Sequence, residues 1–142
     1  MAVEIVTETL DASHFSVEVG EVVRAIQTRT KGEVSVMYGF GCTNDQKNQW
    51  EWISVSTAGL SEFLAVSAQK GIYEQGHADL FVSVPSLAVK VTLCHESDIH
   101  IEAAAEAIQF LDDFRLRWLR QGITVWWKSD DNAQWQKALL PS

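Results

Sequence analysis

Residues 89–101 carry the feature that most constrains the fold, a nearly unbroken alternation of apolar and polar side chains. The odd positions are mostly valine, leucine and isoleucine, whereas the even positions are polar or charged apart from one cysteine. Because successive side chains of a strand point to opposite faces, this pattern predicts a long antiparallel strand with one buried and one solvated face. A rival interpretation ends the strand near residue 96 and starts a helix there, capped by Ser97 or Asp98.

Periodic patterns also mark the other elements. Apolar side chains at helical spacing predict three amphipathic helices, over residues 14–29, 56–71 and 102–122. Strand-like alternation predicts strands over residues 32–40, 50–56, 78–84 and 123–128, with a short first strand near residues 3–5. The strands over 32–40 and 50–56 are expected to form a hairpin with residues 41–48 at its tip. Residues 130–142 are expected to form a short closing helix.

These elements predict an α+β fold, with a mainly antiparallel sheet of about five strands and helices packed on it. The predicted element order is roughly (β)αββαββαβα. The chain shows no internal repeat, no low-complexity tract and no proline- or glycine-rich linker. We therefore expect residues 1–142 to form a single globular domain.

The charge balance narrows the class of partner. The chain has 19 acidic and 11 basic side chains, which gives a net charge of −8. An acidic surface repels phosphate backbones, so nucleic-acid binding is not expected, whereas a basic protein partner suits it. No apolar run is long enough for a membrane helix, and the N-terminal residues lack the pattern of a signal peptide. A cytoplasmic location is expected, with Cys42 and Cys94 as free thiols.

Four side chains close together in sequence invite a chemical interpretation: His95, Glu96, Asp98 and His100. They do not match the HExxH spacing that places two histidines on one helix face around zinc. On a strand, His95 and His100 would face opposite sides, and alternate residues would lie roughly 6.5–7 Å apart along the chain. Because nucleophile and phosphate-loop motifs are also absent, we predict no catalytic residue, no metal ligand and no cofactor. The alternative is a small enzyme or ligand-binding domain in which these four side chains converge with another segment.

The six tryptophans are an unusually large number for a chain of 142 residues. Trp50 and Trp52 share one face of a predicted strand, and tryptophan is enriched among the residues that dominate protein interfaces. A small acidic α+β chain without a catalytic constellation resembles bacterial toxin-immunity proteins in its size, charge and element order. It is similar in the same respects to acidic secretion chaperones.

The leading hypothesis is therefore an immunity-type inhibitor that sequesters a basic, toxin-like protein partner. The side chains expected to contact that partner are Trp50, Trp52, Glu96, Asp98, Asp112 and Asp113. The related alternative is a secretion-chaperone-like homodimer that binds an extended segment. Acidic groups would accelerate association with a basic protein, and buried aromatic side chains would slow dissociation.

Overall fold

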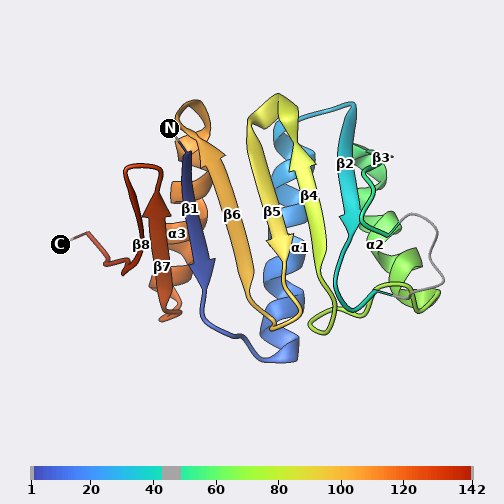
Figure 1. The fold of residues 1–142 in the computed structure, drawn as a ribbon, viewed down its shortest axis with the longest axis horizontal. Coiled ribbons are helices and arrows are strands. Elements are labelled where there is room, and N and C mark those ends of the chain that lie inside the picture. Colours follow the sequence, from blue (N-terminus) through green and yellow to red (C-terminus); the bar gives the residue numbers. More distant parts are fainter. Residues whose placement is uncertain (1, 43–48, 142) are drawn as a thin grey trace.

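Eight strands form one antiparallel sheet in the part of the chain that the computed structural model describes, residues 2–42 and 49–141 (Figure 1). Their bounds are β1 Ala2–Thr7, β2 Glu33–Tyr38, β3 Ile53–Ser56, β4 Leu80–Val84, β5 Val89–Leu93, β6 Ile99–Ala104, β7 Val125–Ser129 and β8 Asn132–Lys137. The strands lie side by side in the order β3-β2-β4-β5-β6-β1-β7-β8. The first strand of the chain therefore sits inside the sheet, between β6 and β7.

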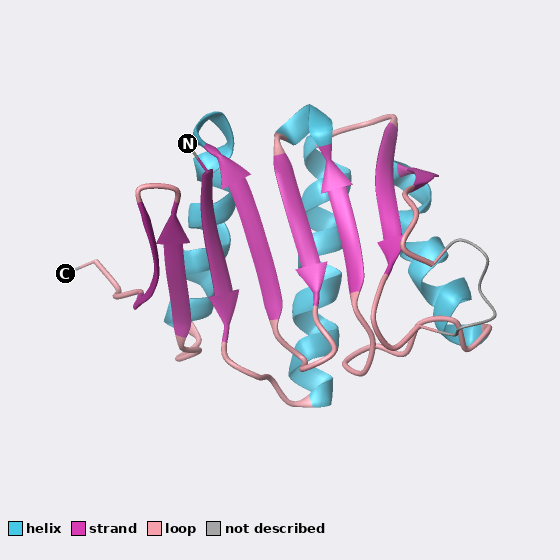
Figure 2. Cartoon of the chain, viewed as in Figure 1, coloured by secondary structure: helices cyan, strands magenta, loops and turns pink. Residues whose placement is uncertain are grey.

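The α-helices of the described residues lie on one face of this sheet, and Figure 2 shows them together behind the strands. Their bounds are α1 Ala12–Arg29, α2 Leu60–Gln69 and α3 Ile108–Arg120, with single 3₁₀ turns at Thr57–Gly59, Pro85–Leu87 and Ala105–Ala107. α1 lies behind the central strands, α3 behind β1 and β6, and α2 near β3. None of these helices is long and apolar enough to cross a lipid bilayer.

The inner strands of the sheet direct alternate side chains into the core between the two layers. Ile5, Val36, Leu80 and Ile101 are completely buried there, and so is Trp118 from α3. A strand presents alternate residues to opposite faces, so the intervening side chains point away from the helices. The fold is thus a two-layer sandwich in which the helices of the described residues cover one face of the sheet.

The 89–101 region is a hairpin and not the single long strand that the alternation predicted. β5 ends at Leu93, and β6 starts at Ile99 and runs back beside it. The turn closes through hydrogen bonds from the Cys94 N–H to the Asp98 carbonyl and from the Ser97 N–H to the Cys94 carbonyl. Ser97 adopts the left-handed region, with φ of 62°, which reverses the chain direction. The rival interpretation of a helix starting at residue 97 is also wrong.

The α+β class agrees with the structure, but the predicted count and order of strands were wrong. Residues 102–104, predicted as helix, belong to β6, because pairing with β1 and β5 on both sides outweighs their local helix propensity. α3 accordingly begins at Ile108. The predicted closing helix is instead β8, which pairs with β7 at the sheet edge. The 32–40/50–56 hairpin is confirmed as β2 and β3, while most of its predicted tip lies outside the described residues.

The buried side chain of Glu18 on α1 forms hydrogen bonds with α3. Glu18 is completely buried, and its two oxygens accept hydrogen bonds from Arg117 at 2.8 Å. One of those oxygens also accepts a hydrogen bond from the indole N–H of Trp118 at 2.8 Å. Burial alone would raise the pKa of Glu18, but the bonds from Arg117 and Trp118 outweigh it and lower that pKa.

We predict that Glu18→Ala lowers the free energy of unfolding by about 3 kcal/mol, because it leaves Arg117 and the Trp118 N–H without their acceptor. This is the low end for a broken buried pair, since the Arg117 side chain remains 39% exposed to water. Urea unfolding measures the change. The matched control is Glu21→Ala on the same helix, which removes a surface pair with Arg24 and should cost at most about 1 kcal/mol. Equal losses in the two variants would contradict the assignment.

The same carboxylate predicts an acid-dependent loss of stability. A pKa that is lower in the folded than in the unfolded protein stabilises the fold above the unfolded value, and this stability disappears as the pH falls through the folded value. The wild-type protein should therefore lose stability below about pH 4.5 more steeply than Glu18→Gln, which cannot ionise at this position. Urea midpoints measured between neutral and acid pH give the two slopes. Parallel curves would show that Glu18 is not the group responsible.

Candidate functional site

The sheet face opposite the helices, here called the open face, presents the polar and aromatic members of the alternating pattern. The strand register aligns them in two rows that cross most of the sheet. The first row is Met37, Phe81, Thr92, His100, Val6 and Trp126. The second row is Ser35, Ser83, Lys90, Glu102, Glu4 and Lys128. Among residues 2–42 and 49–141 no helix covers this face, and a sheet face of this kind is available to a partner.

Exposed tryptophans stand on both sides of the open face. Trp50 and Trp52 are 56% and 51% exposed and lie next to Phe81. Trp135, at 40% exposed, lies on the other side, with its ring centroid 6.3 Å from that of His100. Such large apolar side chains left in water are the kind that anchor interfaces.

The absence of a side chain at Gly39 lets Trp50 pack against Phe81. A Cβ atom at this position would lie 2.5 Å from a ring atom of Phe81 and 3.3 Å from a ring atom of Trp50. No side chain fits there without moving these two rings, whose centroids are 6.4 Å apart. Trp52 then overhangs a groove of about 240 Å³ on the open face, beside Phe81 and Glu102.

Carboxylates outnumber cations on the open face and at its end. The acids are Glu4, Glu8, Glu96, Asp98 and Glu102. The cations are Lys90, Lys128 and the imidazole of His100, whose pKa is raised to about 9, whereas Lys137 lines the hollow on the helix side of the sheet. Lys128 is already engaged, since its ammonium lies 4.6 Å from the Trp135 ring centroid and 3.8 Å from a Glu4 oxygen. The excess of carboxylates gives this face a negative electrostatic potential, which favours a positively charged partner.

A hollow of about 560 Å³ opens at one end of this face, and we call it the end hollow. Its lining comes from the end of β1, the 94–98 turn, β6 and the last two strands: Val6, Thr7, Glu8, Thr9, Cys94, His95, Glu96, Asp98, His100, Trp126 and Trp135. The turn thus brings His95, Glu96, Asp98 and His100 to one hollow, which a single strand would not do. The convergence required by the ligand-site hypothesis is present, and three segments distant in sequence complete it.

His100 is held between two carboxylates. Its Nδ1 lies 2.8 Å from a Glu4 oxygen, and its Nε2 lies 3.5 Å from Oδ1 of Asp98. Burial alone would lower the pKa of His100, but the interactions with Asp98 and Glu4 outweigh it and raise that pKa to about 9. The imidazole is therefore protonated at neutral pH, and the pair of acids next to it is partly neutralised.

His95 belongs to a separate pair at the rim of the end hollow. One Asp79 oxygen accepts hydrogen bonds from the His95 backbone N–H at 2.7 Å and from its Nδ1 at 2.8 Å. The hydrogen bond to Asp79 raises the pKa of His95. Phe40 packs against the imidazole with ring centroids 4.8 Å apart. Asp79, which precedes β4, carried no sequence signal for this role.

Two overlapping groups of side chains have the donor types that hold transition metals. They are Asp79, Cys94 and His95, and Cys94, Asp98 and His100. In each group one donor atom per residue lies within 4.8 Å of the others. Burial, and then the neighbouring carboxylates, raise the pKa of the Cys94 thiol to about 12, so the thiol keeps its proton in this arrangement.

The six side chains expected to bind a partner fall on two different surfaces. Trp50 and Trp52 border the open face, and Glu96 and Asp98 lie in the turn at its end. Asp112 and Asp113 instead lie on α3, in the helix layer behind the sheet. There Asp112 pairs with Arg115 at 3.1 Å and Asp113 with Arg29 at 2.5 Å. One flat partner cannot contact all six, since the sheet separates them.

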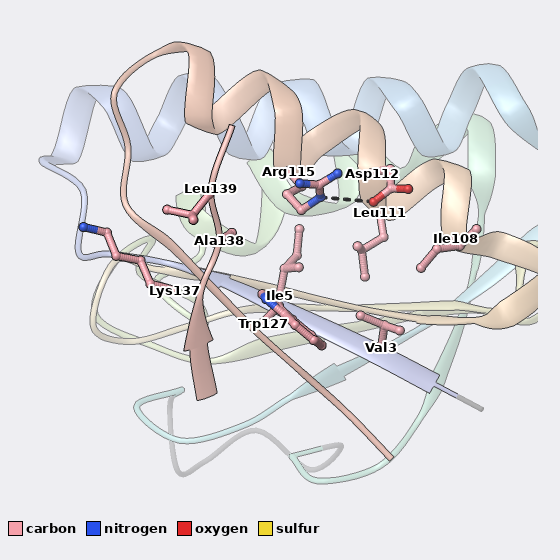
Figure 3. A pocket seen from close by; sticks show the side chains of 10 residues that line it. All are labelled: Val3, Ile5, Ile108, Leu111, Asp112, Arg115, Trp127, Lys137, Ala138 and Leu139. Carbon is pink, nitrogen blue, oxygen red and sulfur yellow. Dashed lines mark hydrogen bonds and ion pairs between the residues drawn. The ribbon is translucent and has the colours of Figure 1, made fainter. Parts of the chain in front are cut away.

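A second hollow, of about 370 Å³, lies between α3, β1, β7 and the C-terminal segment (Figure 3). Its walls are mostly apolar and include Val3, Leu111 and Trp127, with the Asp112–Arg115 ion pair among its lining. Its titratable groups are Lys137 and the Asp112–Arg115 pair, whereas the histidines and the thiol lie in the end hollow.

Comparison with family models, with curated protein sequences and with solved structures found no match to this chain. The function is therefore inferred from the geometry of the open face and its end hollow. The sequence pattern identifies several residues of the open face, since Lys90, Thr92 and Glu102 are polar members of the alternation. Trp135 was missed because its segment was assigned to a packing helix.

We predict that Asp79→Asn lowers the pKa of His95 toward its ordinary value of about 6.5, because the carboxylate that favours the imidazolium is removed. An NMR titration of the histidine ring protons measures the shift. The control is Glu74→Gln, which removes an acid next to His77 and should leave the His95 titration unchanged. An unchanged His95 titration in Asp79→Asn would mean that the Asp79–His95 hydrogen bond does not form in solution.

Proposed function

We propose that this chain is a binding protein that sequesters a basic protein partner on the open face of its sheet. The most concrete form of this proposal is an immunity-type inhibitor of a toxin-like protein in the cytoplasm. The observation that supports it best is the open face itself, which no helix of the described residues covers, and which is acidic in balance and bordered by exposed tryptophans on both sides.

The positions of the tryptophans fit an anchoring role. Trp52 and Trp135 project from opposite sides of a surface that spans the central strands, so a partner seated between them would bury both rings. Each ring buries on the order of 150–250 Å² when it is fully covered. Burial of this size concentrates binding energy in a few residues, as in the interfaces of tight complexes.

The carboxylates fit a steering and selecting role. Glu4 and Glu102 lie at adjacent register positions near the middle of the face, and Glu8 and Glu96 lie at its end. Exposed charges of one sign raise the association rate of an oppositely charged protein and lower that of a like-charged one. The partner class that fits this surface is therefore a folded basic protein.

The experiment is affinity capture from the native cell extract with the purified protein as bait, at low and at high salt. The expected result is one basic protein in equimolar amount, recovered less well as salt screens the charges. Trp52→Ala should weaken the measured affinity for that protein roughly 30-fold, the loss expected at an anchoring tryptophan. Expressed alone, the recovered protein should arrest growth, and co-expression of this chain should restore it.

The matched control is the double variant Asp112→Asn and Asp113→Asn, which removes two charges from the helix layer and leaves the open face intact. It should retain wild-type affinity. A recovered protein whose affinity falls with the helix-layer variant but not with Trp52→Ala would overturn the open-face proposal. A stable homodimer that captures an extended peptide would instead support the secretion-chaperone alternative.

A further inference from the structure

The cluster of Cys94, Asp98 and His100 in the end hollow has a geometry that partner binding does not explain. One donor atom of each residue lies within 4.8 Å of the other two, and the residues come from the hairpin turn and the start of β6. Thiolate, carboxylate and imidazole are the three ligand types found at protein zinc sites. The spacing along the chain, with three residues and then one residue between ligands, is set by the turn.

One of the three separations matches what a tetrahedral ion requires, and the other two are within 4.8 Å. With Zn–N, Zn–O and Zn–S bonds of about 2.0–2.3 Å, ligand atoms lie roughly 3.3–3.6 Å apart. His100 Nε2 and Asp98 Oδ1 are already 3.5 Å apart. That distance is long for a strong hydrogen bond but suits two ligands of one ion.

Glu4 orients the imidazole for ligation. The 2.8 Å contact between Glu4 and Nδ1 of His100 fixes that nitrogen as a donor and turns Nε2 toward Asp98. A histidine ligand that donates its other N–H to a carboxylate is the usual arrangement at zinc sites, where it sets the tautomer and ring orientation. Glu4 lies on β1, so the sheet itself holds this geometry.

Asp98 supplies an independent indication. Its Oδ1 atom is buried and makes no hydrogen bond of normal geometry with any described residue. A buried acceptor without a well-formed hydrogen bond is costly, and Oδ1 has in its place the longer ion pair with His100 at 3.5 Å. A cation next to Oδ1 would remove that cost.

We propose that Cys94, Asp98 and His100 bind one Zn²⁺ ion, with a fourth coordination position open to the end hollow. His95 and Asp79 stay outside the site, since Nδ1 of His95 and one Asp79 oxygen already bond to each other. Three protein ligands with one position left for water is the composition of zinc sites that can accept a further ligand.

Charge balance is compatible with this occupant. Zn²⁺ brings two positive charges, and ligation removes one proton from the Cys94 thiol and one from the His100 imidazolium. The net charge of the cluster is then unchanged, and the open face keeps its acidic balance. The zinc site and the proposed partner surface can therefore coexist, and neither inference depends on the other.

The first test uses the purified protein, stripped of metal and without an affinity tag, and Co²⁺ as a spectroscopic probe. One equivalent of Co²⁺ should produce the thiolate-to-metal charge-transfer band and the intense visible bands of a tetrahedral site, and Zn²⁺ should remove both. Cys94→Ser should lack the charge-transfer band. A wild-type protein that shows neither set of bands would overturn the proposal.

The second test measures Zn²⁺ affinity by competition with a chromophoric chelator. Glu4→Gln should weaken binding about 10–100-fold, the loss typical of a removed orienting partner, and His100→Gln should weaken it further. The controls are His77→Gln and Glu74→Gln, an exposed histidine and an exposed acid outside the end hollow, and both should bind like the wild type. Equal weakening in the controls would show non-specific attraction to acidic groups and would overturn the site. Circular dichroism of each metal-free variant confirms that it is folded.

Discussion

The pairing of β5 with β6 is the constraint on which the rest of the structure depends. Leu93 faces Ile99 across the hairpin, and Val91 faces Ile101, so both strands send their odd-numbered residues toward the helices. This equal parity requires an odd number of residues in the turn, and residues 94–98 supply five. A slip of the β5–β6 pairing by one residue would direct the apolar side chains of β6 to the open face. The core, the polar rows and the end hollow all follow from that register.

That parity also explains what the sequence could and could not predict. Because the turn has an odd length, the alternation continues through it without a break, and a hairpin looks like one strand. The side of the sheet on which His100 lies was therefore predictable, whereas the reversal at Ser97 was not. The only local sign of the turn is its run of polar residues, which an exposed strand shares.

The remaining errors and omissions have a different physical origin. The alanines of β6 favour a helix locally, and only pairing with strands from both ends of the chain makes them strand. Asp79 and Glu4 reach the two histidines from segments far away in sequence, so no motif connects them. By contrast, α1 was predictable, since its apolar stripe and the cap at Asp11 are both local signals.

The one-sided helix layer divides the strand residues into two sets that natural selection can treat separately. Residues that face the helices, such as Val36, Leu80 and Val91, are packed on all sides, and a change of even one methylene there alters stability. Their neighbours Ser35, Phe81 and Thr92 face the other way and contribute little to that packing. During evolution, substitutions can therefore change the charge and polarity of the outer sheet face while the core residues stay the same.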